Sequence, residues 1–146
     1  MRKGRRLAFD VGQARTGVAV SSDDGIFASP VGNIPNPEAA LELVEEYSAI
    51  ELYVGLPLSL SGNNTKSTEH ALEFATKLGE LTQLNVLMVD ERLTTSSAQT
   101  LMRSAGKNSK KARPNIDAAA ATLILEQALA SERAGNSPGK RIEDCL

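Results

Sequence analysis

Asp10 is a carboxylate in an otherwise apolar stretch, which makes it a candidate for metal chemistry. It lies near the end of the run 7–11, which predicts a short buried strand. A carboxylate in that position is partly desolvated and stays ionised only beside a positive charge, such as a metal ion or a basic side chain. A turn-capping aspartate before Gly12 fits the position equally well. Both roles therefore remain open for Asp10 when its position alone is considered.

Asp90 and Glu91 form a second acidic position, directly after the apolar run 85–89. Successive side chains of a strand point to opposite faces of a sheet, so only one of the two acids faces a given site. The strand is apolar throughout, and alternation therefore does not select one of them. The alternative is an acid pair at a solvent-facing strand end, with a salt bridge to Arg92.

Asp117 is the third acidic position and the most anomalous one. It shares a predicted helix face with small and apolar residues, at spacings of three, four, seven and eleven: Ala120, Ala121, Ile124 and Ala128. An acid is favourable in the first turn of a helix. That effect explains the place of Asp117 along the helix but not its inward face, so a functional role is favoured.

Carboxylates from two strand ends and one helix start can meet at one end of a sheet. Hard ions such as Mg²⁺ prefer oxygen ligands of this kind. Two such ions, about 3.5–4 Å apart, activate a water and stabilise the leaving oxygen of a phosphodiester. This chemistry needs neither histidine nor cysteine; His70 is expected on a helix surface, and the single Cys145 cannot form a disulfide within the chain.

The elements that position these acids alternate in type along the chain. Strands are predicted over residues 7–11, 17–21, 26–34, 50–55 and 85–89. Helices are predicted from Pro37 to about Tyr47, over 65–81, from Thr94 or Thr95 to near Gly106, and over 115–134, with a basic loop at 107–114. An antiparallel meander followed by β-α-β-α units indicates an α/β fold, a five-stranded mixed sheet flanked by helices on both faces.

Size and composition are those of one globular domain. The 146 residues, 41% hydrophobic and 23% charged, predict a single domain over residues 1–134 and a mobile tail over 135–146. The basic start resembles a signal peptide, but Asp10 interrupts the apolar run after only three residues. No segment approaches the ~18 apolar residues of a membrane span. We therefore expect a cytoplasmic protein without a membrane partner.

The net charge is −2, and the basic residues are unevenly distributed along the chain. Two clusters contain no acid: Arg2, Lys3, Arg5 and Arg6 at the start, and Arg103, Lys107, Lys110, Lys111 and Arg113 before the last helix. A basic patch on an acidic body is typical of a protein that contacts phosphates on one side. Ordinary solvated surface charge is the alternative, and it is favoured when the clusters are considered alone.

Four motifs in order resemble those of the YqgF/RuvX family of Holliday junction resolvase-like proteins. They are Asp10 to Ala19, Val54-Gly55-Leu56-Pro57-Leu58, Asp90 to Thr95, and Ile116-Asp117 with Ala119, Ala120 and Ile124-Leu125-Glu126. The resemblance spans roughly residues 5–134. It differs from many members at Ser61-Gly62, where Asp-Gly is frequent, and at Arg113-Pro114-Asn115, where lysine is common before the last motif.

The resemblance implies a ribonuclease H-like fold and a nuclease that acts on structured nucleic acid. It implies metal-binding, catalytic carboxylates at Asp10, Glu91 and Asp117, with Mg²⁺ or Mn²⁺, two ions being expected. It also selects Glu91 over Asp90. Members are described both as resolving Holliday junctions and as maturing the 5′ end of precursor 16S ribosomal RNA, so ribosomal particles are expected partners.

Six basic residues are candidates for contacts with nucleic acid: Arg15, Arg92, Lys107, Lys110, Lys111 and Arg113. Aromatic residues are few, at 3% of the chain. Recognition of the backbone and shape of the nucleic acid is therefore favoured over stacking on single strands.

Three functions compete at this point. The first is the metal-dependent nuclease, acting on precursor ribosomal RNA or on branched DNA. The second is ATP binding, since Asp10, Gly12 and Gly17 also resemble a kinase-type phosphate hairpin, but that architecture needs a second domain for which 146 residues leave no room. The third is a non-catalytic RNA-binding assembly factor. A junction resolvase requires a two-fold homodimer, whereas an RNA-processing enzyme can act as a monomer.

Overall fold

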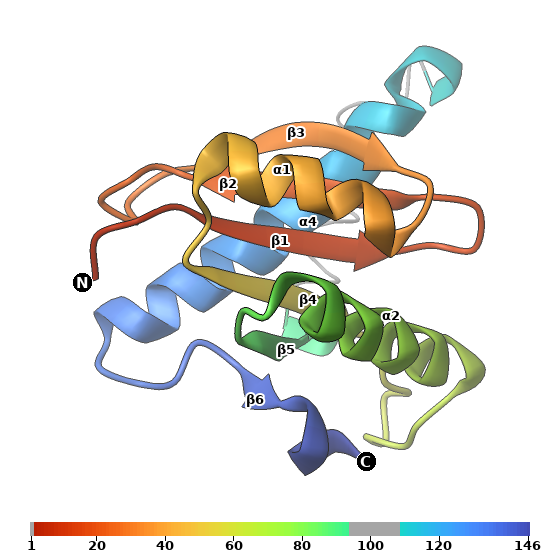
Figure 1. Ribbon diagram of the computed structural model, residues 1–146. Helices are drawn as coiled ribbons and strands as arrows, with labels where there is room; N and C mark the ends of the chain where they lie inside the picture. Colours follow the sequence, from red (N-terminus) through yellow and green to blue (C-terminus); the bar gives the residue numbers. More distant parts are fainter. Residues whose placement is uncertain (1, 94–108) are drawn as a thin grey trace.

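A six-stranded mixed sheet organises the molecule (Figure 1). The computed structural model describes the backbone of residues 2–93 and 109–146, and the side chains of 2–92 and 118–146. The strands are β1 (Arg6–Val11), β2 (Thr16–Ser21), β3 (Ala28–Ile34), β4 (Glu51–Leu56), β5 (Val86–Asp90) and β6 (Lys140–Arg141). Their order across the sheet is β3-β2-β1-β4-β5-β6.

The central strand β1 has an antiparallel neighbour on one side and a parallel neighbour on the other. It pairs with β2 in a hairpin, with Asp10 opposite Gly17, and with β4 in parallel, with Phe9 opposite Val54. β4 in turn pairs in parallel with β5. The carboxyl ends of β1, β4 and β5 therefore lie at one edge of the sheet, which is the arrangement that the predicted site requires.

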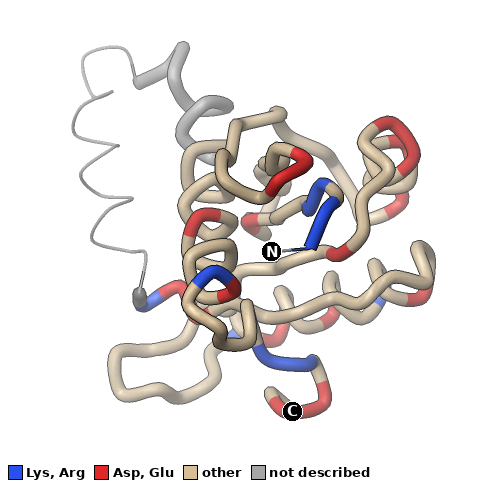
Figure 2. Tube along the Cα trace, turned by 90° about the vertical axis from the view of Figure 1, so that its left-hand side faces the viewer, with Lys and Arg blue, Asp and Glu red and all other residues tan. Residues whose placement is uncertain are grey.

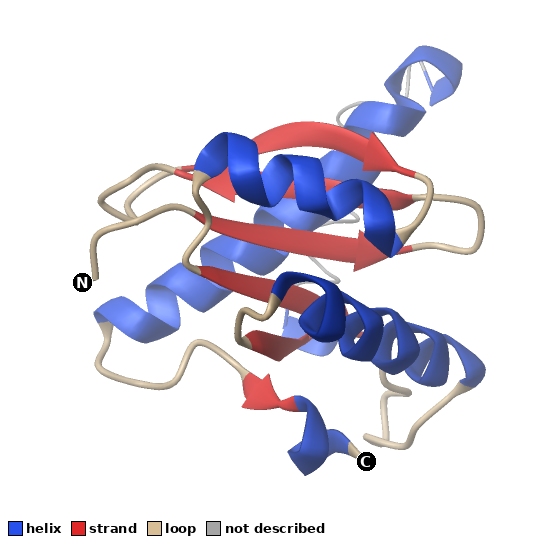
Figure 3. Cartoon of the chain, in the orientation of Figure 1, coloured by secondary structure: helices blue, strands red, loops and turns tan. Residues whose placement is uncertain are grey.

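Helices cover both faces of the sheet, as the sequence predicts (Figure 3). The elements are η1 (Pro37–Ala39), α1 (Ala40–Tyr47), α2 (Lys66–Thr82), η2 (Glu91–Leu93), α4 (Ser109–Arg133) and η4 (Ile142–Cys145). α1 and α2 pack on one face and α4 crosses the other. Asn36 caps η1 by accepting a hydrogen bond from the amide of Ala39 at 3.0 Å, and Thr65 forms a capping box with Thr68 at the start of α2.

Two apolar layers follow from the alternation of side chains along each strand. Leu7 and Phe9 of β1 face α1 and α2 and belong to the larger cluster, where Phe9 meets Phe74 at 5.8 Å between ring centroids. Ala8 faces the opposite way and packs with Ala121 and other residues of α4. Asp10 has the same parity as Ala8, so β1 directs it toward the α4 side of the sheet.

The expectation of five strands is wrong by one, because the C-terminal segment adds β6. β6 pairs antiparallel with β5, with Leu87 opposite Arg141. Ile142 and Cys145 of η4 then pack against the larger apolar cluster. Residues 135–146 contain too few apolar side chains for a readable periodicity, so the sequence pattern predicts no strand there. The mobility of this segment stays a prediction.

The basic segment before the last helix is also corrected. Residues 107–114 were expected to form a loop, but α4 already begins at Ser109 and runs through Pro114. Lys110 to Arg113 are strong helix formers, and α4 continues through Pro114, its sixth residue, so Pro114 does not mark the helix start. A proline there lacks the N–H for one helical hydrogen bond, which is why the sequence pattern indicates a helix boundary at that point. The helix expected at about 94–106 lies outside the described residues. Among the described helices, none is long and apolar enough to cross a membrane.

Candidate active site

Asp10 and Glu91 meet at the carboxyl edge of the parallel strands. Asp10 is the fifth residue of β1, and Glu91 opens η2 directly after β5. The two carboxyl groups share a side-chain hydrogen bond. Residues far apart in sequence are therefore in direct contact because β1, β4 and β5 run in the same direction.

The environment of Glu91 disfavours its charged form. Burial, followed by the negative charge of Asp10, the hydrogen bond with Asp10 and the charge of Asp90, raises the pKa of Glu91 to about 8. Two carboxyl groups in hydrogen-bond contact cannot both ionise without a compensating cation. At neutral pH the pair therefore holds a proton or attracts a positive ion.

Gly55 of β4 provides the space that Glu91 occupies. A Cβ atom at position 55 would lie 2.7 Å from Cδ1 of Ile124 and closer still to Oε1 of Glu91. The glycine of the Val54-Gly55 motif thus permits the close approach of a carboxylate to the sheet backbone. Sequence reasoning assigned no role to Gly55, although a glycine inside a buried strand is a signal of such an approach.

Asp90 is directed elsewhere and pairs with Arg92. Its Oδ2 accepts a hydrogen bond from Nη2 of Arg92 at 2.7 Å, and its Oδ1 accepts one from the Arg92 backbone amide at 2.9 Å. These hydrogen bonds lower the pKa of Asp90. Alternation in the sequence could not choose between the two acids; in the structure Glu91 is the one that contacts Asp10, and the salt bridge considered as an alternative belongs to Asp90.

Asp117 lies in α4, but its side chain is outside the described residues. Its backbone is two helical turns, roughly 10 Å, before Ile124, whose side chain lies over Gly55. Ala118 and Ala121, which follow Asp117 on α4, are buried. Among the side chains that the structure describes, no group of three acids, histidines or cysteines could hold a metal ion. The inward orientation of Asp117 stays a prediction.

Of the basic candidates, two have described side chains. Arg92 is held by Asp90, and its side chain is 37% exposed at the rim of the site. Arg15 lies in the β1–β2 turn, where its carbonyl accepts a hydrogen bond from Gly12 at 3.0 Å. The others fall outside the described residues or side chains: Lys107, Lys110, Lys111 and Arg113.

Two members of the N-terminal basic cluster, Arg2 and Arg6, have a structural role at the end of β1 opposite Asp10. Arg6 is fully buried and its Nη2 forms an ion pair with Glu132 of α4 at 2.7 Å. Arg2 pairs with Glu51 at 2.7 Å, and the Tyr53 hydroxyl donates to the same carboxylate at 2.9 Å. Burial and the neighbouring Glu51 charge raise the pKa of Tyr53.

The sequence does not predict this network because its members are up to 130 positions apart. In Figure 2, short basic stretches of the described chain are interspersed with acidic ones. A phosphate-binding role for Arg2 and Arg6 is therefore not supported, since both are engaged with acids of this chain.

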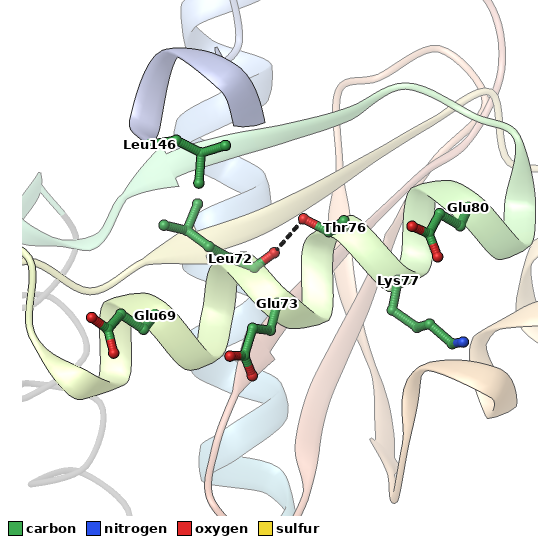
Figure 4. Close-up of a pocket in the computed structure, with 7 residues that line it drawn as sticks. All are labelled: Glu69, Leu72, Glu73, Thr76, Lys77, Glu80 and Leu146. Carbon is green, nitrogen blue, oxygen red and sulfur yellow. Dashed lines mark hydrogen bonds between the residues drawn. The ribbon is translucent and has the colours of Figure 1, made fainter.

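Two hollows lie away from the carboxylate pair. One, of about 340 Å³, is lined by the β1–β2 turn and the start of α2, including Lys66 and His70. The other, of about 450 Å³, follows the outer face of α2 (Figure 4). There the side chains of Leu72 and Leu146 face each other and the glutamates point away. Neither lining includes Asp10 or Glu91.

Comparison with known proteins identifies the family. Residues 4–131 match the model of the family described as "RuvX: Holliday junction resolvase". A protein of Clavibacter sepedonicus named "Putative pre-16S rRNA nuclease" is 48% identical, over 94% of this chain and 90% of its own length. A protein of Streptomyces avermitilis with the same name is 45% identical, over 98% of this chain and 97% of its own length.

The fold also has a solved counterpart. RuvC of T. thermophilus, in complex with a Holliday junction substrate, aligns with a TM-score of 0.60 at 11% sequence identity, over 92% of this chain and 98% of that one. At this identity the likeness establishes the fold, which is that of the ribonuclease H-like class. The match of the family model over nearly the whole chain, with relatives at 45–48% identity, shows that the chain belongs to the RuvX family and is a nuclease.

Proposed function

We propose that this chain is a divalent-metal-dependent nuclease that processes the 5′ end of precursor 16S ribosomal RNA. Asp10, Glu91 and Asp117 are its metal-binding catalytic carboxylates, and Mg²⁺ or Mn²⁺, as two ions, is the cofactor. The observation that carries the proposal is the contact between Asp10 and Glu91 at the carboxyl edge of the sheet.

The donor set suits a hard divalent cation. Both groups offer carboxylate oxygens, which Mg²⁺ and Mn²⁺ prefer over softer ligands. A cation between them would replace the shared proton and offset the repulsion that raises the pKa of Glu91. When bound, the metal supplies Lewis-acid activation of water and of the scissile phosphate. The fit therefore rests on the chemistry and mutual placement of the two acids.

The chain's own residues hold this site in a fixed geometry. Asp10 is fixed by the pairing of β1 with β2 and β4 on its two sides. Glu91 lies against the Gly55 backbone, which the side chain of Ile124 also approaches. Arg92, oriented by Asp90, presents guanidinium donors at the rim, where a phosphate oxygen of the substrate would accept them.

We assign the substrate by the relatives, whose names specify precursor 16S ribosomal RNA. Contacts to its backbone are proposed for Arg15 and for the basic residues around the start of α4, namely Lys107, Lys110, Lys111 and Arg113. Action on a ribosomal particle in the cytoplasm follows from this substrate.

A second candidate function is resolution of Holliday junctions, which the family description favours. Paired cuts across a junction require two sites related by a two-fold axis, and hence a homodimer. Sedimentation of the purified protein with and without four-way DNA distinguishes the two, because precursor RNA processing needs one site only. RNA binding without cleavage would instead favour the non-catalytic assembly factor.

The test offers precursor 16S RNA and a four-way DNA junction side by side, with Mg²⁺, Mn²⁺ or EDTA. We expect cleavage at the 5′ end of the mature RNA, loss of cleavage in EDTA, and a rate at least ~100-fold lower in Asp10→Asn and Glu91→Gln. Glu42→Gln, an exposed acid of α1, is the matched control and should cleave normally. Metal-dependent cleavage that survives Asp10→Asn would refute the proposed site.

A further inference from the structure

Leu60 is an apolar residue at the tip of the connection between β4 and α2, and it is 96% exposed. No other large hydrophobic residue among the described ones is so completely exposed. The connection follows β4, so it emerges from the same edge of the sheet as the carboxylate pair (Figure 1, yellow-green). Phe27, which is 69% exposed, lies in the β2–β3 connection at the opposite edge of the sheet.

The turn that carries Leu60 is braced by its own hydrogen bonds. The amide of Ser59 donates to the carbonyl of Asn63 at 3.0 Å, and that of Gly62 donates to the carbonyl of Ser59 at 2.8 Å. The Ser59 hydroxyl accepts from the Asn63 amide at 3.0 Å and lies 3.0 Å from the Ser61 hydroxyl. The polar groups thus serve the turn itself, while Leu60 is presented outward in a pre-organised position.

The turn also contacts the rim of the active site. Gly62 has a φ of +88°, and a Cβ atom there would lie 3.1 Å from Nη1 of Arg92, so the guanidinium rests against this glycine. Arg92 is held from the other side by Asp90. An apolar tip and an oriented cation are therefore joined in one rigid rim, next to the acid that contacts Asp10.

An apolar side chain beside a cation matches the two surfaces of a nucleic acid, the face of a base and the phosphate backbone. Proteins insert Leu and similar residues as wedges that unstack bases, with basic groups on the adjoining phosphates. We propose that Leu60 is a substrate wedge, which packs on the base at the end of a duplex segment and unstacks it, while Arg92 binds the adjoining phosphate. This inference rests on the proposed nuclease function and adds a preference for boundaries between duplex and single strand.

The test measures unstacking separately from cleavage. In a Glu91→Gln background, which prevents cutting, an RNA hairpin with a single-stranded 5′ extension carries 2-aminopurine in its terminal base pair. We expect its fluorescence to rise on binding. Adding Leu60→Ser should abolish the rise and weaken binding about tenfold, the effect of losing one buried leucine contact. Leu60→Phe should preserve both, and Phe27→Ser is the matched control that should behave as the parent.

Several outcomes would overturn the wedge. They are a parent protein that gives no rise in fluorescence, a Leu60→Ser variant that unstacks the base as the parent does, and equal losses in Leu60→Ser and Phe27→Ser. In the cleavage-competent protein, kcat/KM for the hairpin should fall about tenfold in Leu60→Ser, with Leu60→Phe restoring it. Unstacking without any cleavage by the wild-type chain would refute the proposed function and leave the wedge intact.

Discussion

At the residue scale, two neighbouring acids have opposite environments. Glu91 is half-buried beside Asp10 and its pKa is raised to about 8, whereas hydrogen bonds from Arg92 lower the pKa of Asp90. Glu91 is suited to bind a cation, whereas Asp90, the preceding residue at the end of β5, orients the guanidinium of Arg92. The difference arises from what each side chain contacts, since the two residues have the same chemistry.

The raised pKa of Glu91 predicts a pH-dependent stability of the metal-free protein. Because the folded pKa, about 8, exceeds the ordinary value of 4.5, folding favours the protonated form. This contribution is fully present below pH 4.5 and is lost as the pH rises toward 8, with a limiting slope of about 1.4 kcal/mol per pH unit. Urea unfolding in EDTA should show the free energy of unfolding declining between pH 4.5 and 8, and this decline should be smaller in Glu91→Gln. The same dependence on pH in both proteins would contradict the prediction.

Gly55→Ala should disable the site while leaving the protein folded. The added methyl group would collide with Glu91 and Ile124, displacing the carboxylate and costing about 1–3 kcal/mol of stability. Nuclease activity should fall at least as far as in Glu91→Gln. Gly79→Ala, in α2, is the matched control. The new Cβ would lie 3.6 Å from Val86, an ordinary van der Waals contact, and replacing glycine by alanine should stabilise the helix. Normal activity in Gly55→Ala would show that Glu91 needs no fixed position.

At the element scale, α4 links the two ends of the sheet. Near the C-terminal end of α4, Glu132 pairs with buried Arg6 of β1, and eight residues earlier Ile124 lies over Gly55, which Glu91 also contacts. The ion pair therefore helps to set the position of α4 along the sheet, and with it the position from which Asp117 enters the proposed site. Because α4 packs on the sheet and also carries Asp117, a shift of this helix would move a proposed metal ligand.

Glu132→Gln should destabilise the fold strongly, because it leaves Arg6 buried without its charge partner. Removing one member of a buried ion pair costs about 3–5 kcal/mol, and the retained amide oxygen should keep the loss near the lower value. Urea unfolding at pH 7 measures the change. Glu126→Gln, an exposed acid on the same helix, should change stability by less than about 0.5 kcal/mol. Equal effects of the two substitutions would remove the role assigned to the ion pair.

At the scale of the whole molecule, the C-terminal segment extends the sheet beyond the residues that the family model matches. The family match ends at residue 131, within α4, whereas β6 and η4 follow it and extend the sheet beside β5. The strand that leads into Asp90 and Glu91 is thus supported on both sides. The molecule presents one proposed catalytic edge, and its other edge is closed by the Arg2 and Arg6 ion pairs.

Divalent metal should stabilise the whole fold through the site. A ligand that binds only the folded state adds about 2.7 kcal/mol when it is present at 100 times its Kd. Thermal unfolding with increasing Mn²⁺ should therefore shift upward in the wild-type protein and in Glu42→Gln, but not in Asp10→Asn. In EDTA, Asp10→Asn should be at least as stable as the wild type, because it removes the repulsion with Glu91. A Mn²⁺ shift that persists in Asp10→Asn would place the metal elsewhere.

The order of the first five strands, the helices on both faces and the candidate acids could be derived from the sequence. Hydrophobic periodicity, caps such as Asn36 and turn residues act over a few positions, so they are readable locally. The start of α4 was predicted too late because Pro114 is locally ambiguous. β6 was not predicted because its support comes from β5, which lies some fifty positions earlier.

The sequence by itself determined that carboxylates stand at the ends of apolar strands, and it predicts another, Asp117, on an apolar helix face. Only the tertiary structure decided which of them meet: the parallel pairing of β1, β4 and β5 brings Glu91 to Asp10, and Gly55 leaves room for the contact. It also decided that Arg2 and Arg6 are structural. The physical reason is that burial and electrostatic partnership depend on distances in space, which strand pairing sets and local sequence patterns do not encode.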